Sequence, residues 1–367
     1  MNRRLYIDAL IYKKNKAYGY QEYLFNLLDY FYCVRETINY AEVILLIPQA
    51  EIESFKKYGD VFKIMPFAIQ SKLQHLKIQN TLNRYITFNT NDVILCTYNY
   101  SSLRKYCHQV LVVHDLLFLR KRFLPNYFMR MQRKISIPIS LKKSDKIIAI
   151  SNFTKNDILN NYKIPQSKIV TIYNYFNFKK YTITEDYFKC TKPYFVSICS
   201  NAYHKNTISV LRAFEDFCKT DANFDIVFVG SLTDHQTEAY RYYQNLSNDI
   251  KKRIHLLSHI SNENLGMVYR KAKCFISLTL FEGLGMPLVE AMYFGLPLIV
   301  SDLEICREIV SDNPAFFVNP YDITVISNAM KVVAYEKHTK KDENIKVRFS
   351  QENTSKKYIE LLNSFIN

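Results

Sequence analysis

The amino-acid sequence predicts an α/β protein made of two doubly wound domains. Short apolar runs rich in β-branched residues alternate with longer amphipathic segments along most of the chain. One polar and aromatic stretch, residues 174–192, interrupts this alternation and is predicted to be a linker. A chain of 367 residues is long enough for two domains, each with its own core. We therefore expect two parallel sheets, each covered by helices.

The first domain is predicted to span residues 1–175 and the second residues 176–348. The expected strands of the first are residues 4–11, 43–47, 93–96, 109–113, 146–150 and 169–172, and its expected helices are residues 21–32, 71–88, 126–142 and 152–160. The expected strands of the second are residues 194–199, 225–229, 253–256, 274–277, 297–300 and 315–318, each followed by a predicted helix.

The C-terminal tail, residues 349–367, has apolar residues at helical spacing. This spacing predicts a terminal helix. The helix either crosses back to the first domain or docks on the second.

The net charge of +15 is concentrated in the first domain. Residues 1–175 carry 26 Lys and Arg against 12 Asp and Glu, whereas residues 176–367 carry 23 against 22. This asymmetry predicts that the first domain faces something anionic: a membrane surface, a phosphorylated lipid or nucleic acid. A biased genome composition is the alternative explanation.

The lengths of the apolar runs and the spacing of the cysteines indicate the cellular compartment of the protein. The longest apolar runs, such as residues 294–300, are far shorter than the roughly 20 residues that a membrane-spanning helix needs. The start of the chain carries Asp8 within its apolar stretch, which favours a first strand over a signal peptide. The eight cysteines show neither C-x-x-C spacing nor a Cys/His cluster, so we expect reduced thiols in a cytoplasmic protein and no metal site.

The segment from residue 274 to residue 302 has the pattern of a ligand site. A predicted strand leads into a loop with Glu282, Gly283 and Gly285, and a helix follows. Glycines let backbone N–H groups approach a ligand closely, and a helix N-terminus favours a phosphate or a polar sugar. Glu290 lies one turn into the helix, and side chains there lean back toward its N-terminus. The two carboxylates are therefore predicted to face one ligand, and a solvated loop Glu beside a helix-dipole Glu is the alternative.

The sequence that begins at Glu282, E-G-L-G-M-P-L-V-E-A-M, with G-L-P-L-I-V-S-D close behind it, resembles a family signature. It is similar to the E-x7-E motif of retaining GT-B glycosyltransferases, in glycosyltransferase family 4 (glycosyl transferases group 1). The resemblance implies two Rossmann-like domains that face a cleft. It implies that Glu282 contacts the donor sugar as a catalytic residue, that the amides of Gly283, Leu284 and Gly285 lie against the sugar and diphosphate, and that Glu290 holds the ribose.

A second motif resembles the first strand and turn of the family's second domain. Residues 194–206 read Y-F-V-S-I-C-S-N-A-Y-H-K-N, and the family has a K-N or K-G turn at this place. The resemblance implies that Lys205 binds the donor diphosphate and neutralises charge as it leaves. Many members carry an Arg a few positions earlier, where this chain has Ser200 and Asn201, so the second cation is missing or comes from elsewhere. Asn201 is expected to line the cleft.

Four residues of the first domain match family positions. The V-V-H-D-L stretch implies that His114 meets the donor sugar, and a structural histidine bonded to a backbone carbonyl is the alternative. Gly19 stands in a loop where the family often has two glycines, and the resemblance gives it a donor contact. Ser151, in I-A-I-S-N-F-T, and Asn174, where the family has an I-x-N-G turn, are expected to line the cleft, although an ordinary role for Ser151 is a helix N-cap.

The stretch R-K-R-F-L-P-N-Y-F-M-R-M-Q-R, residues 120–133, interleaves basic with apolar residues. It predicts contact with an anionic membrane surface, or an ordinary amphipathic helix with a basic outer face. The expected location is the cytoplasm, including the inner face of the plasma membrane.

The predicted function is transfer of a sugar from a nucleoside-diphosphate donor, such as a UDP- or GDP-sugar, to a hydroxyl of a glycan or lipid-linked acceptor. The resemblance implies retention of the anomeric configuration and a place in bacterial surface-polysaccharide synthesis (O-antigen, capsule or lipopolysaccharide). No D-x-D motif occurs, and we expect neither a cofactor nor a required metal. The alternatives are a nucleotide-sugar epimerase or a phosphorylase of the same fold and, more remotely, a basic nucleic-acid-binding protein, although nucleic acid is not an expected partner.

Overall fold

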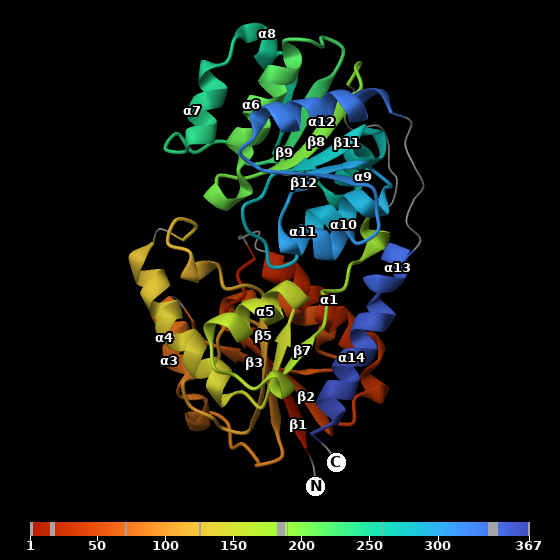
Figure 1. Cartoon of the computed structure of the whole chain (residues 1–367). Helices are drawn as coiled ribbons and strands as arrows, with labels where there is room; N and C mark the ends of the chain where they lie inside the picture. The colour runs from red at the N-terminus through yellow and green to blue at the C-terminus, as the bar shows by residue number, and fades with distance from the viewer. Residues whose placement is uncertain are drawn as a thin grey trace. The chain divides into compact units, whose positions relative to one another are not determined.

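The computed structural model divides the chain into two compact units (Figure 1). Unit 1 comprises residues 1–177 and 349–367, and unit 2 comprises residues 178–348. The structure describes residues 3–14, 19–69, 72–124, 126–181, 188, 190–258, 260–336 and 344–365.

Unit 1 is built on a parallel sheet of seven strands in the order β3-β2-β1-β4-β5-β6-β7. The strands are β1 (Arg4–Asp8), β2 (Glu42–Pro48), β3 (Lys63–Phe67), β4 (Val93–Cys96), β5 (His108–Val113), β6 (Lys146–Ala149) and β7 (Ile169–Thr171). The helices are α1 (Gly19–Cys33), α2 (Ile52–Phe55), α3 (Lys72–Gln79), α4 (Tyr127–Lys143), α5 (Asn152–Asn161) and α14 (Gln351–Asn363). Strands β2, β4 and β5 are buried along their length, except for the partly buried first residues of β2 and β5, because a parallel sheet covered on both faces selects continuous apolar runs.

Several elements of unit 1 differ from the expected ones: β1 ends at Asp8 instead of residue 11, and α2 was not predicted. Strand β3 was not predicted from the sequence, because it lies at the sheet edge, is partly exposed and contains Pro66, which lacks an N–H for a further strand. The helix expected over residues 71–88 begins at a residue outside the described ones, and α3 already ends at Gln79. Side chains bond the carbonyls of its last turn. Asn80 Nδ2 donates to Leu76 O (2.8 Å), which also accepts from the backbone N–H of Asn80. Thr81 Oγ1 donates to Lys77 O (2.9 Å) in place of the Thr81 N–H, which bonds Ile78 O instead (2.9 Å).

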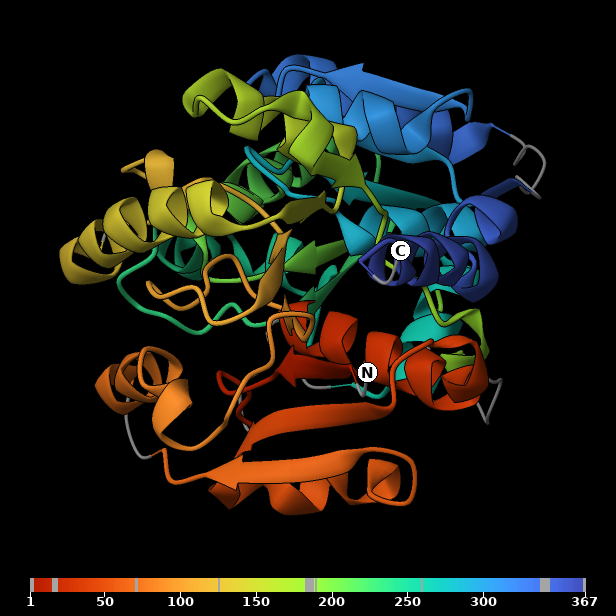
Figure 2. The same ribbon diagram turned by 90° about the horizontal axis from the view of Figure 1, so that it is seen from below.

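The C-terminal helix α14 belongs to unit 1 and lies beside α1 (Figure 2). Tyr358 is buried, and its hydroxyl bonds the hydroxyl of Tyr23 from α1. Tyr40 Oη donates to Leu362 O (2.7 Å), and Thr354 Oγ1 donates to Tyr173 O (3.1 Å). The tail is therefore fixed to unit 1 by buried aromatic packing and by hydrogen bonds at both of its ends.

Unit 2 is built on a parallel sheet of six strands in the order β10-β9-β8-β11-β12-β13. The strands are β8 (Tyr194–Cys199), β9 (Asp225–Gly230), β10 (Ile254–Leu257), β11 (Cys274–Ser277), β12 (Leu298–Ser301) and β13 (Ala315–Val318). The helices are α6 (Thr207–Cys218), α7 (Glu238–Asn245), α8 (Asn248–Lys251), α9 (Asn262–Lys271), α10 (Met286–Tyr293), α11 (Glu304–Val310), α12 (Ile323–Tyr335) and α13 (Asn344–Arg348). In both units the first strand in sequence lies inside the sheet and the chain winds outward to both edges, as expected for doubly wound domains.

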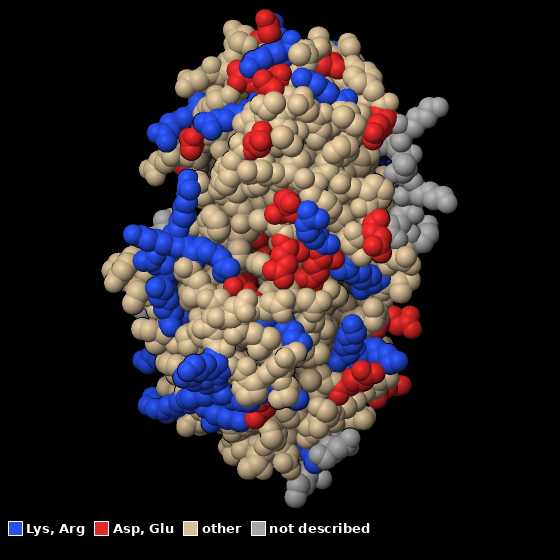
Figure 3. Space-filling view, viewed as in Figure 1, with Lys and Arg blue, Asp and Glu red and all other residues tan. Residues whose placement is uncertain are grey.

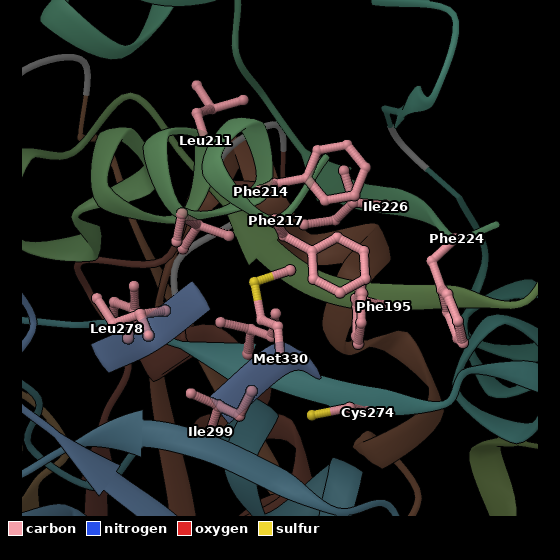
Figure 4. Close-up of a cluster of buried hydrophobic side chains, with 14 of the residues drawn as sticks. Phe195, Leu211, Phe214, Phe217, Phe224, Ile226, Cys274, Leu278, Ile299 and Met330 are labelled. Atoms are coloured by element: carbon pink, nitrogen blue, oxygen red, sulfur yellow. The ribbon is translucent and has the colours of Figure 1, made fainter. Parts of the chain in front are cut away.

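The core of unit 2 contains a group of phenylalanines among aliphatic side chains (Figure 4). Phe214 and Phe217 of α6 are three residues apart and so share one face of the helix, which packs on the sheet. Phe195 of β8 meets Phe217 edge to face with 5.3 Å between ring centroids, and Met330 of α12 fills space beside them. This packing holds β8 and the start of α6 in place, and the chain connecting them carries Lys205.

Gly230 ends β9 in a backbone conformation that other residues rarely adopt, with φ +125°. A Cβ atom built here would stand 2.1 Å from the carbonyl oxygen of Cys199, the last residue of β8. The glycine is therefore required for the close approach of these two strand ends.

Two predictions concern the chain as a whole: the one about membrane-spanning helices and the one about the cysteines. Within the described residues, no helix combines the length and the apolar character that crossing a bilayer requires. All eight cysteines are among the described residues, and all are free thiols.

Candidate active site

The residues singled out in unit 2 gather at the carboxyl ends of the neighbouring strands β8 and β11. In parallel α/β sheets the loops at this edge form the ligand crevice. The carbonyl of His204, in the loop after β8, accepts a hydrogen bond from Leu280 N (2.7 Å) and another from Thr279 Oγ1 (3.0 Å), both from the loop after β11. These bonds hold the two loops together.

Lys205 ends a 3₁₀ turn that leads directly into α6. The next residue, Asn206, has a left-handed backbone with φ 51° and ψ 37°, a conformation that Gly and Asn tolerate best. Its side chain is held on both ends, because Nδ2 donates to Pro320 O (3.0 Å) and Oδ1 accepts from Ser209 Oγ (2.9 Å). The K-N sequence thus has a local physical reason: the turn after the lysine requires a left-handed residue.

Glu282 and Lys205 form an ion pair with 2.5 Å between Oε1 and Nζ. Both side chains are partly accessible, with 18% of Glu282 and 24% of Lys205 exposed. Thr279 Oγ1 also donates to Oε1 of Glu282 (3.2 Å). Burial acts to raise the pKa of the Glu282 carboxyl, but the nearby Lys205 and His204 and the hydrogen bonds from Lys205 and Thr279 outweigh it and hold that pKa below its usual value. Glu282 is therefore an ionised hydrogen-bond acceptor at neutral pH.

The loop from Gly283 to Gly285 leads directly into α10. Gly285 is the N-cap of α10 with φ 84° and ψ 57°, which a residue with a side chain would adopt only under strain. Leu284 is a buried residue that lines the neighbouring cavity. A cavity beside Lys205 and Glu282 is lined by this loop and by Ser197, Ser277, Thr279 and Ile305, among others.

Glu290 lies one turn into α10 and is buried. Its Oε2 accepts a hydrogen bond from Tyr269 Oη (2.8 Å) in α9, and its Oε1 lies 3.5 Å from Lys180 Nζ. Buried carboxylates need such partners to remain charged. The structure therefore brings Glu282 together with Lys205, whereas Glu290 is held by a different pair of side chains.

Asn201 organises a loop. Its Oδ1 accepts from the backbone N–H groups of Thr233 (3.2 Å) and Asp234 (3.3 Å), and its Nδ2 donates to Ser231 Oγ (3.3 Å). The residue expected to line the cleft thus ties the loop after β8 to the loop after β9, with both polar ends of its side chain engaged.

His114 follows β5 in unit 1 and is buried. Its Nε2 lies 2.9 Å from Thr97 O, so this nitrogen carries the proton, and its backbone N–H donates to Asn99 Oδ1 (2.6 Å). Burial lowers the pKa of the imidazole more than the Thr97 carbonyl and Asp115 raise it, so the ring is neutral. The carbonyl bond expected of a structural histidine is thus present, and it leaves Nδ1 as the acceptor nitrogen. Asp115 caps the following turn through Leu117 N (2.9 Å).

The other three residues of unit 1 occupy different environments. Ser151 is fully buried and caps α5, with its Oγ accepting from Thr154 N (3.0 Å), which is the ordinary role expected of it. Asn174 is buried, and its Oδ1 has no hydrogen-bond partner among the described residues. Gly19 is the first residue of α1, with open space where a side chain would stand, while Ala17 and Tyr18 before it lie outside the described residues.

Four residues of these clusters were not singled out from the sequence: Thr279 and His204 beside Glu282, and Tyr269 and Lys180 beside Glu290. Thr279 stands three residues before Glu282, so its position just after a predicted strand could have pointed to it. Tyr269 and Lys180 come from distant segments, and no spacing in the sequence connects them with Glu290.

Two family models match the chain and between them account for most of it. The model described as Glycosyltransferase Family 4 matches residues 40–179, and the one described as Glycosyl transferases group 1 matches residues 182–352. The chain belongs to the family 4, group 1 glycosyltransferases. The chain has the GT-B fold, and its solved structural neighbours share this fold. A glycosyltransferase from Rickettsia africae matches with TM-score 0.73 and 16% identity over 100% of this chain and 99% of that one. Anabaena HepE, solved with UDP and glucose, matches with TM-score 0.68 and 13% identity over 99% and 100% of the two chains.

The curated relatives include two mannosyltransferases. The O-antigen chain mannosyltransferase RfbU of Salmonella typhimurium is 25% identical over 242 residues, which are 66% of this chain and 65% of that protein. The serotype-specific mannosyltransferase WbdA of Escherichia coli is 24% identical over 233 residues, which are 56% of this chain and 27% of that protein. The chain therefore spans less than two thirds of the length of these two relatives.

Proposed function

We propose that this chain is a retaining glycosyltransferase that moves a hexose from a nucleoside-diphosphate sugar to an acceptor hydroxyl during synthesis of a bacterial surface polysaccharide. The observation that carries the proposal is the Lys205–Glu282 pair at the carboxyl edge of the unit 2 sheet. It sets an ionised carboxylate and a partly exposed cation side by side, beside a cavity and the N-terminus of α10. A sugar diphosphate offers hydroxyls to the carboxylate of Glu282 and negative charge to the ammonium group of Lys205.

Each residue of the pair has a separate task in this proposal. Glu282 accepts hydrogen bonds from the donor sugar's hydroxyls, which orients the anomeric carbon. Lys205 exchanges its bond to Glu282 for the diphosphate and stabilises the negative charge that grows as the glycosidic C–O bond to phosphate breaks. The acceptor oxygen then bonds to the anomeric carbon on the same face, and its proton passes to the leaving diphosphate.

Glu290 and the α10 loop position the nucleotide end of the donor. The amides of Gly283, Leu284 and Gly285 face the diphosphate, where the helix N-terminus contributes partial positive charge. Glu290 accepts hydrogen bonds from the ribose hydroxyls. Its bonds to Tyr269 and Lys180 support this role, because they keep the carboxylate charged and fixed in one orientation.

We propose that the transfer requires no metal ion, because Lys205 and the helix dipole supply the positive charge that a metal would bring to the diphosphate. The names of the relatives favour mannose as the first sugar to test, and the UDP and glucose in the HepE structure make UDP-glucose the second.

Unit 1 is proposed to bind the acceptor and to dock on an anionic membrane. Figure 3 shows Lys and Arg side chains gathered over the side of unit 1 that α4 covers. On α4, Phe128 and Ile135 lie two helical turns apart on one face and are 82% and 58% exposed. Two lysines near this face are also exposed: Lys134 precedes Ile135 in the sequence, and Lys142 lies about two helical turns beyond Ile135. An apolar stripe flanked by lysines fits a surface of anionic lipid at the cytoplasmic face.

The test is a donor screen with the purified full chain. GDP-mannose, UDP-glucose and other nucleotide sugars are incubated with it, and release of the nucleoside diphosphate is measured without and with lipid-linked acceptors. We expect slow release from one donor, accelerated by an acceptor, and product that keeps the donor's anomeric configuration by NMR. Inverted product, or a free sugar nucleotide with a changed stereocentre, would overturn the proposal, the latter in favour of an epimerase.

A further inference from the structure

A second cluster of reactive side chains lies at the other edge of the unit 2 sheet, among residues that the glycosyltransferase site does not use. Asp225 is the first residue of β9, and His255 is the second of β10. Cys190 lies in the stretch before β8. Cys190 Sγ is 3.4 Å from Asp225 Oδ2 and 3.7 Å from His255 Nε2, and Nε2 is 2.8 Å from Oδ2.

The fold itself brings these three residues to one place. In the parallel register His255 pairs with Val227, which lies two residues after Asp225 on the same face of β9. Asp225 and His255 therefore project from one face of the sheet. Asp225 N donates to Pro193 O (3.0 Å), which brings the segment preceding β8 alongside and sets Cys190 over that face.

The hydrogen bonding within the cluster leaves a buried atom unsatisfied. Asp225 is 6% exposed, and within the part of the chain that the structure describes its Oδ1 has no hydrogen-bond partner. Its Oδ2 and the Cys190 thiol both face the same nitrogen, His255 Nε2. In a catalytic Cys–His–Asp triad the carboxylate and the thiol would bond opposite nitrogens of the ring. Here all three atoms converge on one point instead.

We propose that Cys190, Asp225 and His255 form a zinc-binding site. Zinc at the usual bond lengths, about 2.3 Å to sulfur and about 2.0–2.2 Å to nitrogen and oxygen, sets tetrahedral ligand atoms about 3.4–3.6 Å apart. The two distances from Cys190 Sγ, 3.4 and 3.7 Å, already match this spacing. The Asp225–His255 distance is that of a hydrogen bond, and the pair opens by under about 1 Å to admit the ion.

The donor set selects the class of metal. A thiolate and an imidazole suit zinc, whereas magnesium and calcium prefer all-oxygen sites. On binding, the Zn–S bond replaces the thiol S–H bond of Cys190 and the proton leaves to solvent. Solvent reaches the cluster, because 29% of the His255 side chain is exposed, so water can supply a fourth ligand. The ring of Phe188 packs against the imidazole edge to face, with 5.4 Å between ring centroids.

The position of the cluster indicates a structural site. It lies at the amino end of β9 and β10, whereas Lys205 and Glu282 follow the carboxyl ends of β8 and β11, so the sheet separates the two by roughly the length of a strand, about 15–20 Å. A bound ion would fasten the segment before β8 to two strands of the sheet. It would thereby stabilise unit 2 without touching the donor.

The experiment uses the full-length chain stripped with a chelator and titrated with zinc against a chromophoric competitor. We expect one zinc ion per chain, a rise in Tm on zinc addition and, with cobalt in its place, a thiolate-to-metal charge-transfer band. Cys190→Ser, which replaces the thiol by a hydroxyl of similar shape, should weaken zinc binding at least tenfold and abolish the cobalt band. His255→Gln, at a partly exposed position, should weaken binding as well.

Cys33→Ser is the matched control, since Cys33 is an exposed thiol in unit 1. It should keep the zinc affinity, the Tm shift and the cobalt band of the unaltered chain. The two cluster variants should also keep the donor turnover, which shows that they are folded. The proposal is overturned if the unaltered chain binds no stoichiometric zinc, or if Cys190→Ser and His255→Gln both bind it as tightly as the unaltered chain.

Discussion

The ammonium group of Lys205 lies 2.5 Å from Oε1 of Glu282, although the two residues are 77 positions apart in the sequence. Each follows the end of a strand, and the strands β8 and β11 are neighbours in the sheet. The pair therefore sits where the parallel sheet opens toward a ligand. Because both side chains are partly exposed, the ion pair can open when a donor arrives.

Replacement of Glu282 by Gln should remove the ionised acceptor and leave the shape of the site unchanged. We expect turnover to fall by about 100-fold or more, as for the loss of one preorganised electrostatic contact, with the fold unchanged by circular dichroism. Glu238→Gln is the control, because Glu238 forms an exposed ion pair with Arg212 on α6. Near-normal turnover in a folded Glu282→Gln variant would remove this residue from the proposed mechanism.

Replacement of Lys205 by Met should change the pH dependence of the reaction as well as its rate. Burial raises the pKa of Glu282, and the charge and the hydrogen bond of Lys205 are two of the influences that lower it, so the pKa should rise when the ammonium group is lost. Since the ionised carboxylate is the active form, the acidic limb of the kcat/KM profile should move to higher pH. Lys205→Arg keeps a positive charge and should show a smaller shift of the limb than Lys205→Met, whereas Arg212→Met at the surface should leave the limb in place. An acidic limb that stays where it was in Lys205→Met would show that it does not report Glu282.

Removal of the Glu290 charge tests the contact with the nucleotide. Glu290→Gln should raise the donor KM about tenfold, the factor expected for one charged hydrogen bond, and lower kcat less. Tyr269→Phe removes only the internal hydrogen bond to Oε2 and should raise KM by a smaller factor. If KM is unchanged in Glu290→Gln, the carboxylate serves the packing of α10 against α9 and not the donor.

Gly230→Ala should destabilise unit 2. The added Cβ would meet Cys199 O at 2.1 Å, and φ +125° is unfavourable for any residue with a side chain. The free energy of unfolding should fall by more than about 2 kcal/mol in chemical denaturation. Gly19→Ala, where a Cβ meets open space, should change it by less than about 1 kcal/mol. Equal stability of the two variants would mean that the β8 and β9 ends separate at little cost.

The apolar stripe on α4 should control membrane binding. Phe128→Ser should reduce flotation with vesicles that contain anionic phospholipid several-fold, because an exposed aromatic ring is lost from the stripe. Tyr85→Ser removes an aromatic residue that is 60% exposed elsewhere in unit 1 and should leave flotation unchanged. Binding should weaken as salt rises, and preference for DNA over vesicles would contradict membrane docking.

Local patterns in the sequence predicted much of unit 2 and its candidate site. Each strand of unit 2 was expected within about two residues of its observed bounds, because strands buried on both faces are written as continuous apolar runs. Two backbone conformations near these residues explain why a short motif could identify them. Gly285 has a positive φ just before α10, close to Glu282. Lys205 is followed by a residue with a left-handed backbone. The family models match the parts of the chain that carry these patterns.

Edges and ends were predicted less well. Strand β3 has an exposed pattern and a proline, and α3 is cut short by Asn80 and Thr81, whose side chains compete with the helix. Ser151 illustrates a further difficulty, because the sequence suits both a ligand contact and a helix cap at this residue; the structure shows the cap, and the ligand contact stays a prediction.

The sequence by itself determined the alternation of strands and helices, the glycine loop with its two glutamates and the family to which the chain belongs, since each rests on neighbours along the chain. The tertiary structure decided the partners: Lys205 for Glu282, Tyr269 and Lys180 for Glu290, and Cys190 with Asp225 and His255. These groups come from segments tens of residues apart. Parallel pairing brings distant strands side by side, and only that pairing determines which side chains meet.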